Sequence, residues 1–572
     1  MRSIQIIGLL LGLLMVGQGC QQDEFLTLKN PNTITTDTYW QTPSQFQSGL
    51  ASVYSALQFD AVSGKSLSND MCRGDLAGTE SWYSEIAFRN LTFNDNTEYV
   101  SQRWNQLYVG VFRANQVIEN LKKEGIDLTE QDKKVLGGQA RFLRAMFYFW
   151  LVNSYDGAVI QLDVAKEDAD FSKAFSSQEE VYQQVILPDL TYASENLPKR
   201  WTNAKDLGRV TWGAAMSMLG KVHLYQKNWA EAATFFKAVV DSKVYSLMPN
   251  YLDNFTDEKE HNAESIFEVS FSNALKPGVN SGIVDDNIYE KGAEASGMAV
   301  ALGQLSFGAY NTTLPSYYAH ELFVNDEPDA SSPINEGRKQ SARTYASIVP
   351  INGDGLYYQL PIGKKPGWAF GQSAYVKKYT NWYHWTQEDA VYQRSGINFR
   401  HIRLADIYLM YAEAILNRDG NAGVSEAMAA IDIVRKRAGV VTLAQYMDKN
   451  GGKIPLLHRS YIKGARTYLA PDAGVLLTHL QRVERPVELA FEGHRWYDLV
   501  RWGIVKEIFT ELRVEEEWRQ KNIDLKNPVA PLFIRERIRP DFTVASTAYN
   551  PAAHDYLPIP TGEVQSNPNL KK

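Results

Sequence analysis

Cys20 is the residue whose position most clearly indicates a chemical modification, because its thiol follows a short apolar run near the N-terminus. The run covers residues 4–16, comes after the basic Arg2, and is shorter than the roughly 20 apolar residues that cross a membrane. This arrangement is typical of a secretion signal, and a cysteine directly behind such a signal is typical of bacterial lipoproteins, whose thiol is acylated. We predict a lipoprotein signal peptide over residues 1–19 and lipid attachment at Cys20. The alternative is an ordinary secretion signal followed by a chance cysteine.

Glu488 and Glu492 form a carboxylate pair whose spacing would suit hydrolysis. One helical turn apart, their carboxylates would lie within about 5–6 Å, close to the separation used by retaining glycosidases. Arg485 and Arg495 stand beside them in the sequence, and acidic residues among arginines on a helix usually form ion pairs. We therefore expect ion pairing here rather than catalysis.

No other sequence pattern suggests an enzyme. The chain has no C-x-x-C, H-E-x-x-H, G-x-S-x-G or P-loop pattern, and its nine histidines lack metal-ligand spacing. We predict no catalytic residue, no metal site and no cofactor.

The element that must position the two carboxylates is a predicted helix within residues 482–503. The i,i+3 pairs Glu492–Arg495 and Asp498–Arg501 can stabilise such a helix. Gly493 weakens it by about 1 kcal/mol relative to alanine. The segment is thus expected to be structural.

Residues 212–242 predict a pair of packed helices with a break at residues 227–228. Leu219, Gly220 and Ala232 fall on the Leu-Gly and Ala positions of the tetratricopeptide pattern, and a phenylalanine follows at its expected place. The small Gly220 would let the two helices approach closely. A looser copy occupies residues 403–439, and an α-helical repeat scaffold is the simplest interpretation. Further helix pairs are expected at residues 37–59 with 98–121 and 129–155 with 178–197.

Residues 245–400 differ from the helical blocks. Gly, Asn, Ser and Pro are closely spaced there, and short Tyr/Val/Ile stretches at 266–271 and 374–379 predict short strands. Loops this long are usually functional or disordered, and the many aromatic residues argue against disorder. A binding function is therefore expected in this region.

Composition restricts the classes of partner. The net charge is −7 and no basic cluster occurs, so nucleic acid is not an expected partner. With Cys20 acylated, only Cys72 remains, and no intramolecular disulfide can form. The mature chain of about 550 residues is longer than a chain that folds around a single hydrophobic core usually is. Two lobes or a layered array are therefore expected.

Three stretches make the chain resemble a known family. They are residues 141–155 (R-x-L-R-A-x-x-Y-F-x-L-V-x-x-Y), 482–503 (RVERPVELAFEGHRWYDLVRWG) and 556–570 (YLPIPTGEVQSNPNL). Together with the lipoprotein cysteine, they resemble the SusD/RagB family of Bacteroidota, surface lipoproteins that partner a SusC-type TonB-dependent transporter. The resemblance implies a tetratricopeptide-like scaffold, anchored in the outer membrane, whose variable loop face captures a nutrient, most often an oligosaccharide.

A glycan site should combine exposed aromatic rings, which stack on the C–H faces of sugars, with polar groups for the hydroxyls. Residues 66–89 offer such a combination in a glycine-containing segment, and residues 289–385 offer further aromatic residues. The alternative for each aromatic residue is that its side chain fills a gap between the loops and the scaffold and contacts no ligand. The predicted ligand-binding residues are Asp75, Trp82, Tyr83, Tyr289, Tyr310 and Trp368.

The expected fold is mainly α, a SusD-like helical repeat scaffold with a long irregular loop region and short strands. The expected division is a signal peptide (1–19), a polar tether (20–38), an N-terminal helical domain (39–244) and a loop-rich domain with further helices (245–572). Two other functions stay open: an accessory lid for peptide import, whose groove would also use Tyr and Asn, and an exported glycoside hydrolase.

Overall fold

The computed structural model of the chain describes residues 39–166, 168–275, 294–350, 353–362, 374–459, 466–522 and 539–570. Helices dominate it, and every strand belongs to a two-stranded sheet. The predicted mainly helical class with short strands is therefore confirmed. Among the described residues, no helix is both long and apolar enough to cross a membrane.

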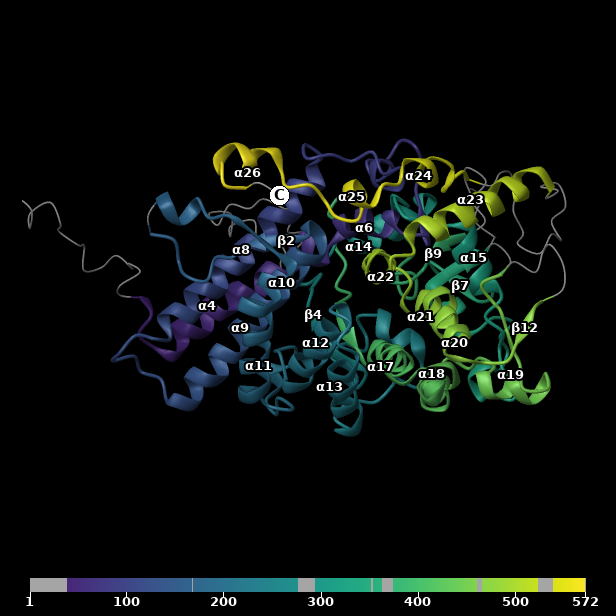
Figure 1. Cartoon of the computed structure of the whole chain (residues 1–572), viewed down its shortest axis with the longest axis horizontal. Helices are drawn as coiled ribbons and strands as arrows, with labels where there is room; N and C mark the ends of the chain where they lie inside the picture. Colours follow the sequence, from purple (N-terminus) through teal and green to yellow (C-terminus); the bar gives the residue numbers. More distant parts are fainter. Residues whose placement is uncertain are drawn as a thin grey trace, which may run out of the picture.

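The N-terminal helices lie side by side at one end of the molecule (Figure 1). Thr42 and Thr129 begin the first and third of them with capping boxes, in which each hydroxyl accepts a hydrogen bond from a backbone N–H of the first turn. The third helix is buried around most of its circumference. In chain order these helices are α4 (Pro43–Ser55), α8 (Glu98–Asn120), α9 (Glu130–Tyr155), α10 (Gln178–Val181) and α11 (Leu187–Asn196).

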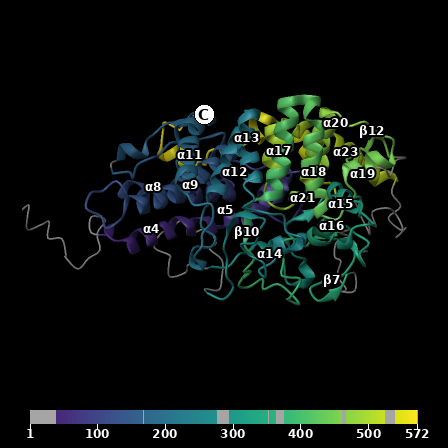
Figure 2. The same cartoon turned by 90° about the horizontal axis from the view of Figure 1, so that it is seen from below.

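Two helix pairs confirm the predicted tetratricopeptide-like units. A Cβ atom on Gly220 would lie 2.6 Å from a ring carbon of Phe236, so only glycine permits this approach between the first pair. The two pairs pack on each other and continue the helical layer (Figures 1 and 2). They are α12 (Trp212–Tyr225) with α13 (Trp229–Asp241), and α17 (Leu404–Asp419) with α18 (Val424–Arg437).

The loop-rich region lies along one side of this layer (Figure 2). Strands occur where residues 266–271 and 374–379 predict them, as β4 (Ser265–Val269) and β9 (Ala374–Val376). Three short helices were not predicted there, because fewer than three turns give too little periodicity to detect. They are α14 (Met298–Leu302), α15 (Tyr317–Val324) and α16 (Ala342–Ser347).

Antiparallel pairs join strands that are often distant in sequence. The longest pair is β4 with β10 (Phe399–Arg403), which connects the loop region to the start of α17. The other pairs are β1 (Ala77–Gly78) with β5 (Leu314–Pro315), β2 (Gly157–Val159) with β3 (Phe175–Ser177), β6 (Ile348–Pro350) with β9, β7 (Leu356–Tyr357) with β8 (Leu360–Pro361), and β11 (Ile454–Pro455) with β12 (Tyr468–Leu469).

The predicted helix over residues 482–503 is wrong in part, because the structure breaks it into α21 (Arg485–Leu489) and α22 (Arg495–Trp502). Phe491 and Gly493 between them have φ angles of 62° and 79°, which a helix does not allow. The i,i+3 pair Asp498–Arg501 forms at 2.8 Å. The pair Glu492–Arg495 does not form, since the break turns the two side chains toward other partners.

Glu488 and Glu492 are ion-pair partners, as predicted, but of Arg403 rather than of the neighbouring arginines. Arg403 contacts Glu488 at 2.6 Å and Glu492 at 2.7 Å, and Lys378 contacts Glu492 at 2.9 Å. All four side chains are buried. Buried carboxylates are tolerated only with such partners, so this pair belongs to the core and faces no cleft.

The C-terminal segment runs back across the molecule to the N-terminal helices (Figure 1). The backbone N–H of Leu557 donates to the carbonyl of Ser154 at 2.6 Å, and that of Thr561 to Asp95 at 3.2 Å. The remaining helices are α5 (Asp60–Ser63), α6 (Ser68–Arg73), α7 (Ile86–Arg89), α19 (Leu443–Lys449), α20 (Ala473–His479), α23 (Val505–Asn522), α24 (Thr543–Ala548), α25 (Pro551–His554) and α26 (Thr561–Ser566).

Candidate ligand-binding site

Two of the predicted ligand-binding residues, Tyr83 and Tyr310, meet although they lie 227 positions apart. The Tyr83 hydroxyl donates a hydrogen bond to the backbone carbonyl of Tyr310. The Tyr310 hydroxyl in turn donates to the carbonyl of Ala390 at 3.0 Å. These bonds bring the 66–89 segment, the 305–312 segment and the loop around residue 390 to one place.

Pairing of β1 with β5 explains why these segments meet. Ala77 lies opposite Pro315 and Gly78 opposite Leu314, which places the turn that carries Tyr83 next to the residues before β5. A Cβ atom on Gly78 would lie 2.0 Å from a carboxylate oxygen of Asp541, so this close packing requires glycine.

A cavity of about 570 Å³ opens beside the two tyrosines. Its wall comes from α5, α6, the turn before α7, the start of α8 and residues 301–312. The wall combines aromatic rings with hydrogen-bonding groups and has few aliphatic side chains. The lining residues are Asp60, Lys65, Ser66, Ser68, Asn69, Tyr83, Ser84, Glu85, Phe88, Thr97, Glu98, Tyr99, Gln102, Ala301, Tyr310 and Thr312.

Exposed aromatic side chains stand next to this cavity. Trp82 is 53% exposed, and its ring centroid lies 5.9 Å from that of Tyr83. Tyr392, two residues beyond Ala390, is 58% exposed. Sequence reasoning missed Tyr392, because only the hydrogen bond from Tyr310 places its loop beside the cavity.

Acidic groups outnumber basic ones on the cavity wall. Asp60, Glu85 and Glu98 supply carboxyl groups, and Lys65 supplies the single ammonium group. Burial raises the pKa of Asp60 to about 6, although the Lys65 ammonium 3.9 Å away opposes this shift. Lys65 also donates to the amide oxygen of Gln393 at 2.7 Å, which ties the wall to the loop that carries Tyr392. The wall therefore offers many hydrogen-bond acceptors for hydroxyl groups.

Asp75 is not part of the cavity, which corrects its prediction as a ligand contact. Its side chain is fully buried, and both carboxylate oxygens accept hydrogen bonds from Arg495 at 2.6 Å. An arginine 420 positions away neutralises it, and the sequence around Asp75 gives no sign of that partner.

Three other predicted residues, Cys20, Tyr289 and Trp368, lie outside the described residues. Within the part of the chain that the structure describes, no group of three or more His, Cys, Asp or Glu side chains is arranged to hold a metal ion.

Two family models match the chain. The model described as "SusD family" matches residues 351–572, and the model described as "Starch-binding associating with outer membrane" matches residues 24–224. The two matches lie in opposite halves of the chain and do not overlap.

Curated relatives match almost from end to end. A SusD-like protein of Formosa agariphila is 25% identical over 578 residues, which cover 96% of this chain and 94% of that protein. A SusD-like protein of Bacteroides ovatus is 24% identical over 84% of this chain and 79% of its own length.

Solved structures share the fold. A SusD superfamily protein from Bacteroides vulgatus superposes with a TM-score of 0.72 at 22% identity, covering 93% of this chain and 99% of that one. A laminarin-binding SusD-like protein gives a TM-score of 0.64 at 24% identity, covering 92% and 98%. The two family models, which match separate parts of the chain, and the curated relatives that cover most of it show that the chain belongs to the SusD family.

Proposed function

We propose that this chain is a cell-surface lipoprotein that binds an oligosaccharide or polysaccharide and delivers it to a TonB-dependent outer-membrane transporter. The observation that carries the binding step is the cavity where Tyr83 and Tyr310 meet a wall of polar groups, with Trp82 exposed beside it. Aromatic faces and convergent hydrogen-bonding groups are what sugar rings and hydroxyls require.

The names of related proteins support a glycan as the ligand. One matching family model is described as starch-binding, and one structural neighbour binds laminarin. Both are polymers of uncharged glucose, which suits a wall whose carboxyl groups would repel an anionic chain.

Anchoring and delivery rest on other observations. Cys20 behind an apolar run supports a lipid anchor, and the matched family is described as associating with the outer membrane. Similarity to the SusD family supports a SusC-like transporter as the partner. A bound glycan would pass from the cavity to that transporter without chemical change.

Affinity electrophoresis of the purified protein against a panel of polysaccharides tests the binding step. We expect at least one uncharged polysaccharide to retard the protein, and the double variant Trp82→Ala/Tyr392→Ala to migrate freely. The same mixtures should yield no new reducing ends.

Two outcomes would replace the proposal. New reducing ends would indicate a glycoside hydrolase. Free migration with every polysaccharide, combined with saturable binding of a peptide library, would indicate an accessory protein for peptide import.

A further inference from the structure

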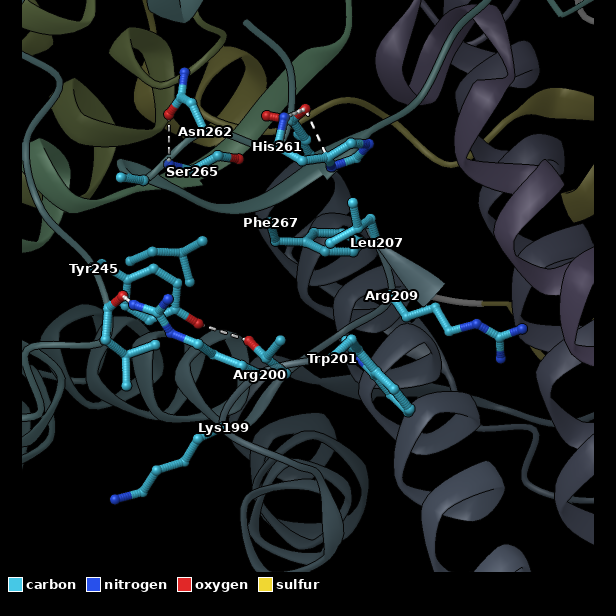
Figure 3. A pocket seen from close by; sticks show the side chains of 16 residues that line it. Lys199, Arg200, Trp201, Leu207, Arg209, Tyr245, His261, Asn262, Ser265 and Phe267 are labelled. Carbon is cyan, nitrogen blue, oxygen red and sulfur yellow. Dashed lines mark hydrogen bonds and ion pairs between the residues drawn. The ribbon is translucent and has the colours of Figure 1, made fainter. Parts of the chain in front are cut away.

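A second groove lies beside the loop of residues 199–211, apart from the ligand cavity (Figure 3). It consists of a pocket of about 350 Å³ and a neighbouring pocket of about 410 Å³. Both pockets are lined by the turn of residues 207–209 and by Glu268. Among the described residues, none that lines the ligand cavity also lines this groove.

The turn of residues 207–209 is fixed in place by close packing. Gly208 has a φ angle of +88°, and a Cβ atom there would lie 2.7 Å from the ring of His261. Leu207 stays 55% exposed on the turn and faces both pockets. An apolar side chain is thus held out over the groove.

Two partly exposed aromatic rings lie on opposite sides of the first pocket (Figure 3). The Trp201 indole N–H donates to the carbonyl of Val210 at 3.0 Å, and the hydroxyls of Tyr245 and Thr211 share a hydrogen bond of 2.8 Å. The polar edge of each ring is therefore satisfied within the protein. The guanidinium of Arg209 lies 6.0 Å from the Trp201 ring centroid, and the Tyr245 ring packs against Gly213, so stacking on a ligand ring uses the side of each aromatic ring that lines the pocket.

The mouth of the pocket carries unbalanced positive charge. Lys199 and Arg200 are exposed, and within the described part of the chain neither has a carboxylate at ion-pair distance. The Lys199 ammonium lies 5.2 Å from the Trp212 ring centroid, and the Arg200 guanidinium donates to the backbone carbonyl of Val244, so both keep their charge unneutralised. Asp206 is already paired with Arg209 at 2.9 Å, and the buried Glu268 with Arg400 at 3.0 Å. Glu294 lines the neighbouring pocket rather than the first one, and its carboxylate accepts a hydrogen bond from Gln58 at 2.9 Å. A chain of net charge −7 thus has a local cationic site.

We propose that this groove is a second saccharide-binding site, and that it takes a sugar unit bearing a carboxylate or sulfate group. The sugar ring stacks between Trp201 and Tyr245, and its anionic group binds Lys199 and Arg200. The ligand cavity, with three carboxyl groups and one ammonium group, has the opposite preference. The two sites together would allow one protein to hold a glycan that carries both neutral and charged units.

Isothermal titration calorimetry on the purified full chain tests this site with three tetrasaccharide probes: a galacturonate, a sulfated galactan fragment and a neutral glucan. We expect one anionic probe to bind, and its affinity to fall several-fold at high salt because exposed charges are screened. The variants Trp201→Ala and Lys199→Gln/Arg200→Gln should each weaken it about tenfold, the change that a contact of about 1.4 kcal/mol makes. Trp82→Ala should leave it unchanged.

A matched control removes two exposed positive charges elsewhere, Lys122→Gln/Lys134→Gln, and should leave the affinity unchanged. The charge variants alter exposed residues only, so they test the site even if Trp201→Ala misfolds. The proposal is overturned if neither anionic probe binds at millimolar concentration, or if the control variant weakens binding as much as the Lys199/Arg200 variant does. It is also overturned if the Trp201 and Lys199/Arg200 variants lose the same affinity for the neutral probe. A further contradicting outcome is that Trp82→Ala alone abolishes binding of the anionic probe.

Discussion

Arg495 holds Asp75 through two hydrogen bonds of 2.6 Å, although the two residues lie 420 positions apart. The hydroxyl of Ser316 donates to the backbone carbonyl of Asp75 at 2.6 Å. The first residues of the chain segment that carries Trp82 are therefore fixed to α22 and to the start of α15. The position of the ligand cavity depends on a buried ion pair that takes no part in the cavity itself.

Replacing Asp75 by asparagine should destabilise the fold. The change leaves the buried Arg495 cation without its partner, which typically costs about 3–5 kcal/mol. The free energy of unfolding in urea measures this loss, and Asp127→Asn, at an exposed aspartate, is the control. Wild-type stability combined with a lost glycan affinity would instead restore Asp75 as a ligand contact.

Trp82→Ala should weaken glycan binding about tenfold, because one stacking contact contributes about 1–2 kcal/mol to the binding free energy. The unfolding midpoint should stay near that of the wild type, because the exposed Trp82 side chain contributes little to the core. Titration calorimetry and thermal unfolding of the same preparation give both quantities. Phe171→Ala removes another exposed aromatic side chain, 69% exposed, that lines a different cavity. It should change neither quantity. Unchanged affinity for Trp82→Ala with a lowered midpoint would make Trp82 a filler between loop and scaffold.

Trp496→Ala should destabilise the protein by roughly 3–5 kcal/mol, the range for removing a large buried aromatic side chain. Trp496 is 1% exposed, the guanidinium of Arg73 lies 4.3 Å from its ring centroid, and its indole N–H donates to the backbone carbonyl of Asp555 at 3.2 Å. Urea unfolding measures the loss. A variant that unfolds like the wild type but binds no glycan would contradict the structural role of this segment.

The sequence predicts the helical scaffold well because helix packing leaves a local signal. Gly220 and Phe236 lie 16 positions apart, and their contact follows from a repeat pattern that spans two adjacent helices. The site is only partly predictable. Composition indicates Tyr83 and Tyr310 separately, but their meeting depends on strand pairing between residues more than 200 positions apart, which no local pattern encodes. The prediction of Asp75 as a ligand contact is wrong for the same reason, because its partner Arg495 lies 420 positions away in the sequence.

Cys20→Ala should release the protein from the membrane fraction while leaving its fold intact. Acyl chains on Cys20 would supply the anchor, because covalently attached lipid chains hold a protein at a membrane surface. Fractionation in a strain without the transporter, followed by a salt wash, tests this directly. A variant that still sediments with membranes would show that lipidation of Cys20 is not the anchor.

Asp60→Asn should stabilise the protein above pH 6 and have little effect below pH 4. Burial raises the pKa of Asp60 from 3.8 to about 6, so between these values the folded state holds a proton that the unfolded chain has released. Stability therefore falls as pH rises through this window, and the full penalty, up to about 3 kcal/mol, is present above pH 6. Asparagine carries no charge and avoids that penalty.

The free energy of unfolding of wild type and Asp60→Asn, measured in urea at pH 4 and pH 7.5, checks this prediction. The difference between the two proteins should appear only at pH 7.5. Asp127→Asn, a substitution of an exposed aspartate, is the control. A difference of equal size at both pH values would mean that Asp60 acts through packing. An asparagine variant less stable at pH 7.5 would mean that the ion pair with Lys65 outweighs the cost of burying the charge.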